Sequence, residues 1–353
     1  EVLKRRGVEN PGQRLVMIRS WNTSTLLIGE REFTEAQIAA LKSFCAGRWF
    51  DLGWYPGMKG DEANRFNILP QAWLHEGAVQ LLGHEAESFF DRYKFDVRPA
   101  TDDRPHFFHF LKWRTLGELF ALREQGGMPL VEQGYLLLVA TLAQAVLVSA
   151  ALILLPLRFA AGSEDAAPEA RGRILAYFLA VGTGFMLVEI AFIQKFILFL
   201  SHPLFAISVV LTSFLVFAGL GSAWSHRWSE REVLGRVVTG IVVLAAAYLV
   251  VLPGVFERLM HLDDTFKVLV SVGLIAPLAL LMGMPFPLGL DRVARRAPGW
   301  IPWAWGVNGC ASVVSAVLAT LLAVHAGFSL VVMLALGVYG LAYVAALPLK
   351  QTG

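Results

Sequence analysis

Charge and cysteine are both scarce in this sequence of 353 residues. Asp, Glu, Lys and Arg make up 16% of the chain and hydrophobic residues 56%, which excludes an ordinary soluble globular protein. The formal net charge of +2 gives no indication of a nucleic-acid partner. The two cysteines, Cys45 and Cys310, are far apart and have no neighbouring His or Cys cluster, which leaves metal and redox chemistry without support.

An initiator methionine and a signal peptide are also missing from the sequence. Its first residues, EVLKRRGVENPGQR, have the pattern of a helix end followed by a turn, and predict that the chain starts inside a domain. Residues 1–130 mix charge, Gly and Pro at the density of a soluble domain, whereas almost every later segment is apolar. We therefore expect two domains, residues 1–130 and residues 131–353.

Residues 1–130 alternate between strand and helix patterns, as at the edge of an α/β sheet. Residues 33–48 predict a helix, because Thr34 stands at the N-cap position and Gln37 follows three residues later, as in a capping box. Further on, AWLHEGAVQLLG and AESFFDRYKF predict short amphipathic helices. The predicted strands are residues 14–21, 23–30 and 50–57.

Seven apolar segments after residue 130 are long enough to span a membrane, which takes about 20 residues of helix. We expect a bundle, because small residues recur at helical spacing in residues 219–222 and between Asn308 and Ala319, where helix backbones can approach closely. The expected fold class is mainly α, a polytopic transmembrane helix bundle preceded by the end of an α/β domain. The segments are residues 132–157, 174–200, 203–225, 234–256, 266–289, 303–325 and 328–348.

Arginine is concentrated in alternate loops between these segments. By the positive-inside rule, the loops that carry the arginines are cytoplasmic. If all seven segments span, residues 1–130 lie on the opposite, periplasmic side; the alternative is that residues 132–157 do not cross as a simple span. The arginines are Arg158, Arg171, Arg173, Arg227, Arg231, Arg236, Arg292, Arg295 and Arg296.

Four stretches of the sequence together carry a family resemblance: FMLVEIAFIQKFILFLSHPLFAISVVLTSFLVFAGLGS, MGMPFPLGL, PWAWGVNG and PATDDRPHFFHFLKW. With these motifs the chain resembles the C-terminal portion of bacterial spermidine synthase-like membrane proteins, in which a Rossmann-type aminopropyltransferase or methyltransferase-like domain sits between two sets of transmembrane helices. The resemblance covers essentially the whole chain. It implies that residues 1–57 are the last helix and strands of the Rossmann-like domain, and that the bundle is half of a major-facilitator-type arrangement in the bacterial inner membrane.

The nucleotide-binding motifs of that family do not occur in this sequence. They are a Gly-rich loop after the first strand, where backbone N–H groups approach the cofactor, and an acidic residue on the ribose at the end of the next strand. The acidic strand-end motif with which an aminopropyltransferase deprotonates its amine also has no counterpart in residues 1–57. We therefore expect no catalytic residue, cofactor site or metal site in this chain. The resemblance implies S-adenosylmethionine or decarboxylated S-adenosylmethionine for the full-length protein, with catalytic motifs upstream of Glu1.

Glu189 is a carboxylate about halfway along an apolar segment. An ionised carboxylate at that depth costs at least a few kcal/mol, so Glu189 must be protonated, paired or facing a cavity. Gly182 lies on the same helix face and lets a neighbouring helix come close, so that Asn308 or a basic side chain can supply the partner. The two readings are a structural hydrogen bond between helices and a proton or substrate pathway. Lys195 is at the wrong angular step to pair with Glu189, and we expect it to snorkel toward the interface.

The stretch TDDRP places Asp102, Asp103 and Arg104 between two prolines. One reading is a polar clamp on an amine-bearing ligand or on the adjacent domain. The other is a loop in which Asp102 caps a turn and Arg104 pairs with Asp103. His106 and His109 follow directly, and a metal site with these carboxylates is the weaker reading beside interfacial aromatic and histidine side chains at the membrane entry.

Asn308 and a group of prolines are the remaining polar or irregular features inside the apolar segments. Asn308 lies between glycines, where its amide can hydrogen-bond across helices or line a pathway. Pro277, Pro285 and Pro287 should kink or unwind the segment 266–289, as in transporter sites or at a helix end.

Three classes of function follow from these features. The first is the membrane-embedded half of a spermidine synthase-like protein, acting as an anchor or a substrate-handling bundle. The second is a transporter-like bundle with a vestigial synthase domain, and the third a structural or assembly subunit of a larger membrane complex. The expected partners are the lipid bilayer and either the N-terminal half of the same protein or other membrane subunits, with no nucleic acid.

Overall fold

The computed structural model describes residues 2–83, 86–115, 117–118, 133–159, 168–225, 227 and 233–346. Arg231, the boundary expected at residue 130 and the last two residues of the seventh predicted segment lie outside these ranges. The chain divides into two compact units, which are described separately. Residues 1–99 with 110–128 form the N-terminal unit, and residues 100–109 with 129–353 form the bundle. Residues 100–109 therefore belong with the bundle, although the expected boundary placed them in the first region.

The N-terminal unit contains a three-stranded sheet with the strand order β2-β1-β3. Both pairings are antiparallel, and the pairing of β1 with β3 shifts by one residue between Met17 and Ile18. The strands lie within the three predicted segments, and buried Val16 and Asp51 anchor β1 and β3. The helical and strand elements are α1 (Val2–Arg5), η1 (Pro11–Arg14), β1 (Leu15–Arg19), β2 (Ser24–Ile28), α2 (Glu35–Ala46), β3 (Asp51–Trp54), η2 (Gly60–Glu62), α3 (Trp73–Leu82), α4 (Ala86–Arg92) and η3 (Trp113–Thr115).

Local side chains fix the ends of these elements. The expected capping box of α2 is present: the Gln37 backbone N–H donates to Thr34 Oγ1 at 3.3 Å, and the Thr34 backbone N–H donates to Gln37 Oε1 at 2.9 Å. At the start of β3, the Asp51 carboxylate accepts hydrogen bonds from the backbone N–H groups of Arg65, Phe66 and Asn67. Burial alone would raise the pKa of Asp51, but these three N–H donors outweigh it and hold the pKa below its ordinary value.

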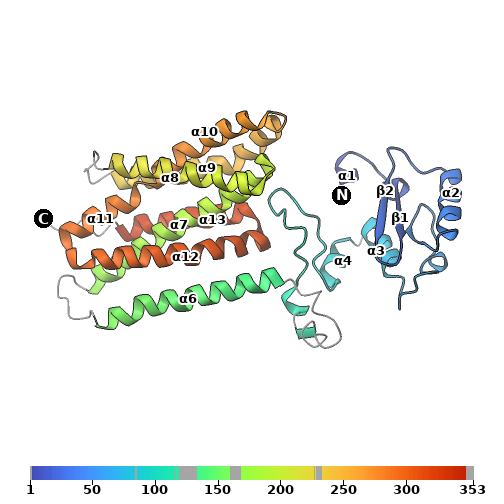
Figure 1. Ribbon diagram of the computed structural model, residues 1–353, viewed down its shortest axis with the longest axis horizontal. Helices are drawn as coiled ribbons and strands as arrows, with labels where there is room; N and C mark the ends of the chain where they lie inside the picture. Colours follow the sequence, from blue (N-terminus) through green and yellow to red (C-terminus); the bar gives the residue numbers. More distant parts are fainter. Residues whose placement is uncertain are drawn as a thin grey trace. The chain divides into compact units, whose positions relative to one another are not determined.

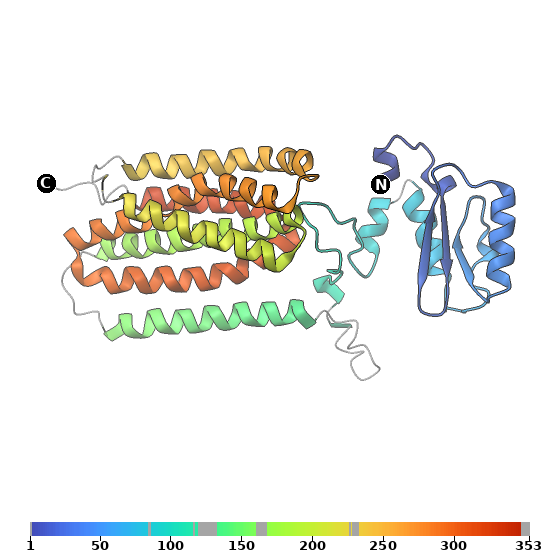
Figure 2. The ribbon, with the colours of Figure 1, turned by 45° about the horizontal axis from the view of Figure 1, so that its top comes forward.

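The bundle consists of long apolar helices that run roughly along one direction in both ribbon views (Figure 1, Figure 2). Within the described residues, seven spans are long and apolar enough to cross a membrane, which identifies a multi-pass membrane protein. The helices are α6 (Gln133–Phe159), α7 (Pro168–Leu200), α8 (Pro203–Ser225), α9 (Val233–Leu259), α10 (Asp264–Met282), α11 (Pro285–Arg296), η6 (Pro298–Trp300), α12 (Ile301–Ala326) and α13 (Phe328–Ala346). All seven predicted segments are present as helices; most limits agree within a few residues, but α7 begins six residues before its prediction, and the segment predicted over 266–289 divides into α10 and α11 and extends to Arg296.

The central helix of the bundle is α7, which packs mainly against α12 and α13. Asn308 and Ser315 of α12 bond to Phe178 and Thr183 of α7, and Tyr339 of α13 covers Gly184. Further along α7, Lys195 lies near Ser329 at the start of α13. The helix α7 is therefore parallel to α12 and antiparallel to α13, whereas α6 packs on α12 at one edge of the bundle (Figure 1, Figure 2).

The bundle has two chemically different ends. Near Tyr177, the start of α7 meets α11 and the end of α13, and arginines of α7 and α11 gather there, Arg171 against Trp300 and Arg292 beside Tyr177. We call this the arginine end. At the opposite end, Lys195 and Ser329 lie beside residues 100–109, and Tyr135 near the start of α6 bonds to His325 near the end of α12. We call this the Asp103 end. Because α6 runs from one end to the other, it crosses the bundle as a simple span.

Glycines permit direct backbone contact between α8 and the end of α10. A Cβ on Gly221 would lie 1.9 Å from the Leu280 carbonyl oxygen, and a Cβ on Gly283 would lie 2.0 Å from the Ala218 carbonyl oxygen. The two backbones therefore touch directly, as the small residues at 219–222 predicted. Apolar burial gives little drive for association in lipid, so this packing contributes directly to the stability of the bundle.

Candidate functional site

The Asp103 end is organised around one loop carboxylate. Asp103 Oδ1 accepts hydrogen bonds from the Ser329 backbone N–H at 3.0 Å and from Ser329 Oγ at 2.7 Å. The Asp103 carbonyl oxygen accepts a third hydrogen bond from the Phe328 N–H at 3.0 Å. The first N–H groups of a helix have no partner inside the helix and carry partial positive charge. Asp103 therefore caps α13 from a loop distant in sequence.

Gly327, between α12 and α13, makes room for this cap. Its φ is +89° and its ψ 166°, a conformation that essentially only glycine adopts. A Cβ on Gly327 would lie 2.3 Å from Asp103 Oδ2 and 3.1 Å from Arg104 Cγ. The turn before α13 and the loop at 100–109 therefore fit only with glycine at this position.

Lys195 is the second charged group at this end. Its Nζ lies 3.8 Å from Asp103 Oδ1, and its side chain is 18% exposed. This distance forms an ion pair but exceeds the length of a hydrogen bond. The Lys195 side chain reaches toward the end of the bundle, as expected of a snorkelling lysine. Its ammonium group, however, lies beside the carboxylate of Asp103.

The structure contradicts one of the two readings of TDDRP, the loop in which Asp102 caps a turn and Arg104 pairs with Asp103. The turn at 101–104 is closed by backbone hydrogen bonds between Thr101 and Arg104, with Thr101 Oγ1 accepting from the Arg104 N–H at 3.2 Å, so that Thr101 rather than Asp102 caps it. No ion pair joins Arg104 to Asp103 in the part of the chain that the structure describes. The Asp103 carboxylate faces the start of α13 instead. There the N–H and the O–H of Ser329 both donate to it, and these two hydrogen bonds at a helix N-terminus stabilise the carboxylate more than an exposed ion pair with Arg104 would.

The histidines after this turn extend the contacts between the loop and the bundle. The His106 ring lies edge-on to Phe328, and its Nε2 is buried with no hydrogen-bond partner among the described residues. Burial lowers the pKa of His106, and the nearby His109 lowers it further. His109 contacts the rings of Tyr135 and His325, and Tyr135 Oη lies 2.6 Å from His325 Nε2. In the described ranges, no three His, Cys, Asp or Glu side chains are placed to hold a metal ion.

Glu189 lies deeper in the bundle and is 5% exposed. No hydrogen bond or ion pair to it is formed by any described residue. Asn308, considered as its partner, is used elsewhere: its Nδ2 donates to the Phe178 carbonyl oxygen at 3.1 Å, beside Gly182. Asn308 therefore joins α12 to α7 near the arginine end, at a carbonyl group about three helical turns before Glu189. Of the expected site residues, Asp103 and Lys195 are brought together, and Glu189 and Asn308 are separate.

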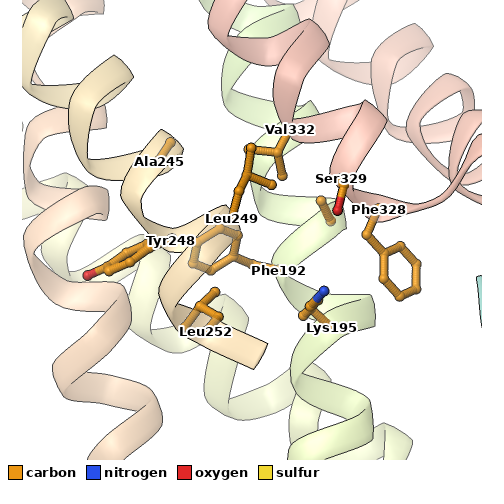
Figure 3. A pocket seen from close by; sticks show the side chains of 10 residues that line it. Phe192, Lys195, Ala245, Tyr248, Leu249, Leu252, Phe328, Ser329 and Val332 are labelled. Atoms are coloured by element: carbon orange, nitrogen blue, oxygen red, sulfur yellow. The ribbon is translucent and has the colours of Figure 1, made fainter. Parts of the chain in front are cut away.

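A pocket opens between α7, α9 and α13 beside Lys195 (Figure 3). It holds about 330 Å³ of space, including the part that is open to its surroundings. Among the described residues that line it, Lys195 is the only charged one. Tyr248 Oη donates to the Leu274 carbonyl oxygen, and the Ser329 hydroxyl donates to Asp103. The lining residues are Ala191, Phe192, Lys195, Ala245, Tyr248, Leu249, Leu252, Phe328, Ser329 and Val332.

The helix break predicted by the prolines is present at the arginine end. The helix α10 ends at Met282, and α11 begins at Pro285. Tyr177 of α7 donates its hydroxyl hydrogen to the Pro285 carbonyl oxygen at 2.6 Å, and Gly289 makes room for the Tyr177 ring. The break therefore has a fixed geometry and is closed by a buried tyrosine.

Sequence reasoning missed the residues that hold the Asp103 end together. Ser329, Gly327, Tyr135 and His325 had no motif that singled them out. The sequence HAGFS does indicate the boundary between α12 and α13, because a glycine directly before an apolar run is typical of a helix end. It does not say which distant residue completes that boundary.

Comparison with known proteins gives no relative for this chain. No protein-family model matches it, and searches of curated proteins and of solved structures found no match.

Proposed function

We propose that this chain is the membrane-embedded half of a spermidine synthase-like protein of the bacterial inner membrane. In this proposal the bundle anchors the synthase domain and handles its substrate or product. The four stretches that carry the family resemblance support it. They include the loop that holds Asp103 and the helix that holds Glu189.

The observation that carries the proposal is the cap that Asp103 places on α13. Residues 100–109 lie in sequence between the two segments of the N-terminal unit and before the described spanning helices, and Asp103 ties them to Phe328, Ser329 and Lys195. A passive tether needs no such contacts. Residues 100–109 are instead part of the fold of the bundle. This is what we would expect if the bundle acts together with the synthase domain and does not only anchor it.

The architecture of the N-terminal unit is compatible with this proposal. A Rossmann-type sheet is mainly parallel and often carries an antiparallel edge strand. The described strands β1 to β3 pair only antiparallel, so they suit the edge of such a sheet and not its nucleotide-binding centre. The proposal accordingly assigns the cofactor site to sequence upstream of Glu1.

The test is aminopropyl transfer in membranes that contain the product of the whole gene. We expect spermidine to form from labelled putrescine and decarboxylated S-adenosylmethionine, and no product from residues 1–353 alone. A methyltransferase-like relative would use S-adenosylmethionine instead, so both cofactors are supplied in separate assays. If the whole gene product is intact in the membrane but binds neither cofactor, the proposal is wrong.

A second candidate is proton-coupled transport, and Glu189 favours it. A carboxyl group inside a membrane bundle without a partner is expensive to keep charged and is characteristic of proton relays. We propose that Glu189, if the bundle transports, takes up and releases the coupled proton. Transport of labelled putrescine into proteoliposomes under a pH gradient should then be abolished by Glu189→Gln.

The matched control for this test is Glu257→Gln, which neutralises an exposed carboxylate on α9. It should leave uptake unchanged. Uptake that survives Glu189→Gln would exclude the proton role, and equal loss in both variants would point to a general charge effect.

A further inference from the structure

The ammonium group of Lys195 is the uncommitted polar group of the pocket between α7, α9 and α13. No described residue accepts a hydrogen bond from it, and its ion-pair partner Asp103 Oδ1 lies 3.8 Å away. That oxygen is already occupied by two hydrogen bonds from Ser329. A partly buried ammonium with three donors favours an anion that can approach to hydrogen-bond distance.

The rest of the pocket wall selects an apolar chain. Phe192, Leu249 and Val332 expose only hydrocarbon, and the hydroxyl groups of Tyr248 and Ser329 already donate to protein oxygens. A small inorganic anion would satisfy Lys195 and leave this apolar surface uncovered. Pockets of this composition bind ligands that are mostly apolar and carry a few polar groups.

The direction of the pocket matches the direction of a lipid. Lys195 lies five residues before the end of α7 at Leu200, which is roughly 7–8 Å along the helix axis. Ala191 lies four residues deeper, and Figure 3 shows Phe192, Leu249 and Val332 grouped on the other side of the pocket from Phe328. The cation is therefore near the interface, and the apolar wall extends toward the hydrocarbon region.

We propose that this pocket binds an amphiphile with an anionic head group and an acyl chain, the head group on Lys195 and the chain along α7, α9 and α13. Asp103 competes for the same ammonium group. Binding therefore replaces the ion pair between Lys195 and Asp103, while the hydrogen bonds from Ser329 to Asp103 remain. The head group is a phosphate of a phospholipid or the carboxylate of a fatty acid, which present the same chemistry to a lysine.

The test is native mass spectrometry of the full chain released from detergent with defined additives. The probes are phosphatidylglycerol, phosphatidylcholine, oleate and inorganic phosphate. We expect the chain to bind one anionic amphiphile with an affinity at least about tenfold higher than that for phosphatidylcholine. One charge-assisted hydrogen bond contributes a difference of this size. Stronger retention of phosphatidylglycerol assigns a phosphate head group, and stronger retention of oleate assigns a carboxylate.

Variants separate this site from general surface charge. Lys195→Gln should lose the preference for the anionic amphiphile, and Lys195→Arg should keep it. Asp103→Asn should increase it severalfold, because asparagine still accepts from Ser329 but no longer competes for the ammonium group. Arg258→Gln, which removes an exposed cation at the end of α9, is the control and should change nothing.

Three results would overturn the proposal. The first is equal retention of phosphatidylglycerol, oleate and phosphatidylcholine by the native chain. The second is a preference for anions that survives Lys195→Gln. The third is inorganic phosphate bound as tightly as the amphiphile, since the acyl chain would then contribute nothing.

Discussion

Asp103 and Ser329 are 226 residues apart in the chain and are joined by two hydrogen bonds to the same carboxylate oxygen. A loop residue that precedes the seven described spans thereby caps the seventh, α13. The cap uses a charged acceptor at a helix N-terminus, where the helix dipole strengthens the interaction. The stability of the bundle therefore depends on a residue outside its helices.

Replacing Asp103 should measure this dependence directly. Asp103→Ala removes the acceptor and should lower the free energy of unfolding by about 1–2 kcal/mol, as the loss of a helix cap does. Asp103→Asn keeps an oxygen for Ser329 and should cost less. Thermal unfolding of the purified chain in detergent gives the comparison, with exposed Asp102→Ala as the control. Equal losses for Asp103→Ala and Asp103→Asn would contradict the cap.

Gly327 should resist substitution because of its backbone and its surroundings. Gly327→Ala places a Cβ 2.3 Å from Asp103 Oδ2 at a φ of +89°, and should destabilise the bundle by about 1–3 kcal/mol. Gly337→Ala is the matched control, because no atom lies within 4 Å of its added Cβ and alanine favours a helix. It should leave the melting temperature unchanged or raise it. A similar loss of stability in both variants would contradict the close contact between Gly327 and the loop at residues 100–109.

Gly221 offers a second matched pair, between α8 and α10. Gly221→Ala directs a Cβ at the Leu280 carbonyl oxygen, a backbone atom that cannot rotate away, and should cost about 1–3 kcal/mol or more. Gly219→Ala, two residues earlier on an open face, should be neutral. A disulfide cross-link engineered between α8 and α10 should form more slowly in Gly221→Ala only. Unchanged cross-linking there would show that the two backbones are not in contact.

The N-terminal unit should lose stability in acid through Glu62. Hydrogen bonds from Lys42 and Tyr55 lower the pKa of Glu62 from 4.5 to about 2. Because the folded-state pKa lies below the unfolded one, the contribution of Glu62 is complete above about pH 4.5 and is lost as the pH falls toward 2. Unfolding followed by tryptophan fluorescence should show this loss, and Glu62→Gln should remove that part of the pH dependence. An identical acid profile in Glu62→Gln would contradict the assignment.

The sequence predicts the helices well because their signals are local. The length and apolarity of each span fixed its limits, Thr34 and Gln37 fixed the start of α2, and Pro285 marked the break after α10. Each of these signals acts within a few residues along the chain. The same holds for the small residues near Gly221, whose spacing indicates a contact face without naming the partner helix.

The candidate site is less accessible to sequence reasoning because it joins distant residues. The sequence indicates Asp103 as a candidate, but it suggests the neighbouring Arg104 as the partner, and the pairing with Ser329 depends on how α13 is placed. Asn308 was considered as a partner for Glu189, yet it bonds to Phe178 because parallel α7 and α12 align it there. Apolar periodicity gives no information on which helices are neighbours, so these pairings follow only from the packed bundle.

The cap on α13 also sets an order for biogenesis. Asp103 is synthesised before the seven described spans, and its partner Ser329 is synthesised after six of them. Closing a loop of this length is slow, since the chain loses conformational entropy before the contact between Asp103 and Ser329 can form. Residues 100–109 therefore cannot dock until α13 has been made and inserted. A chain that stalls before α13 would leave that loop undocked, which offers quality-control proteases a means to distinguish unfinished molecules from finished ones.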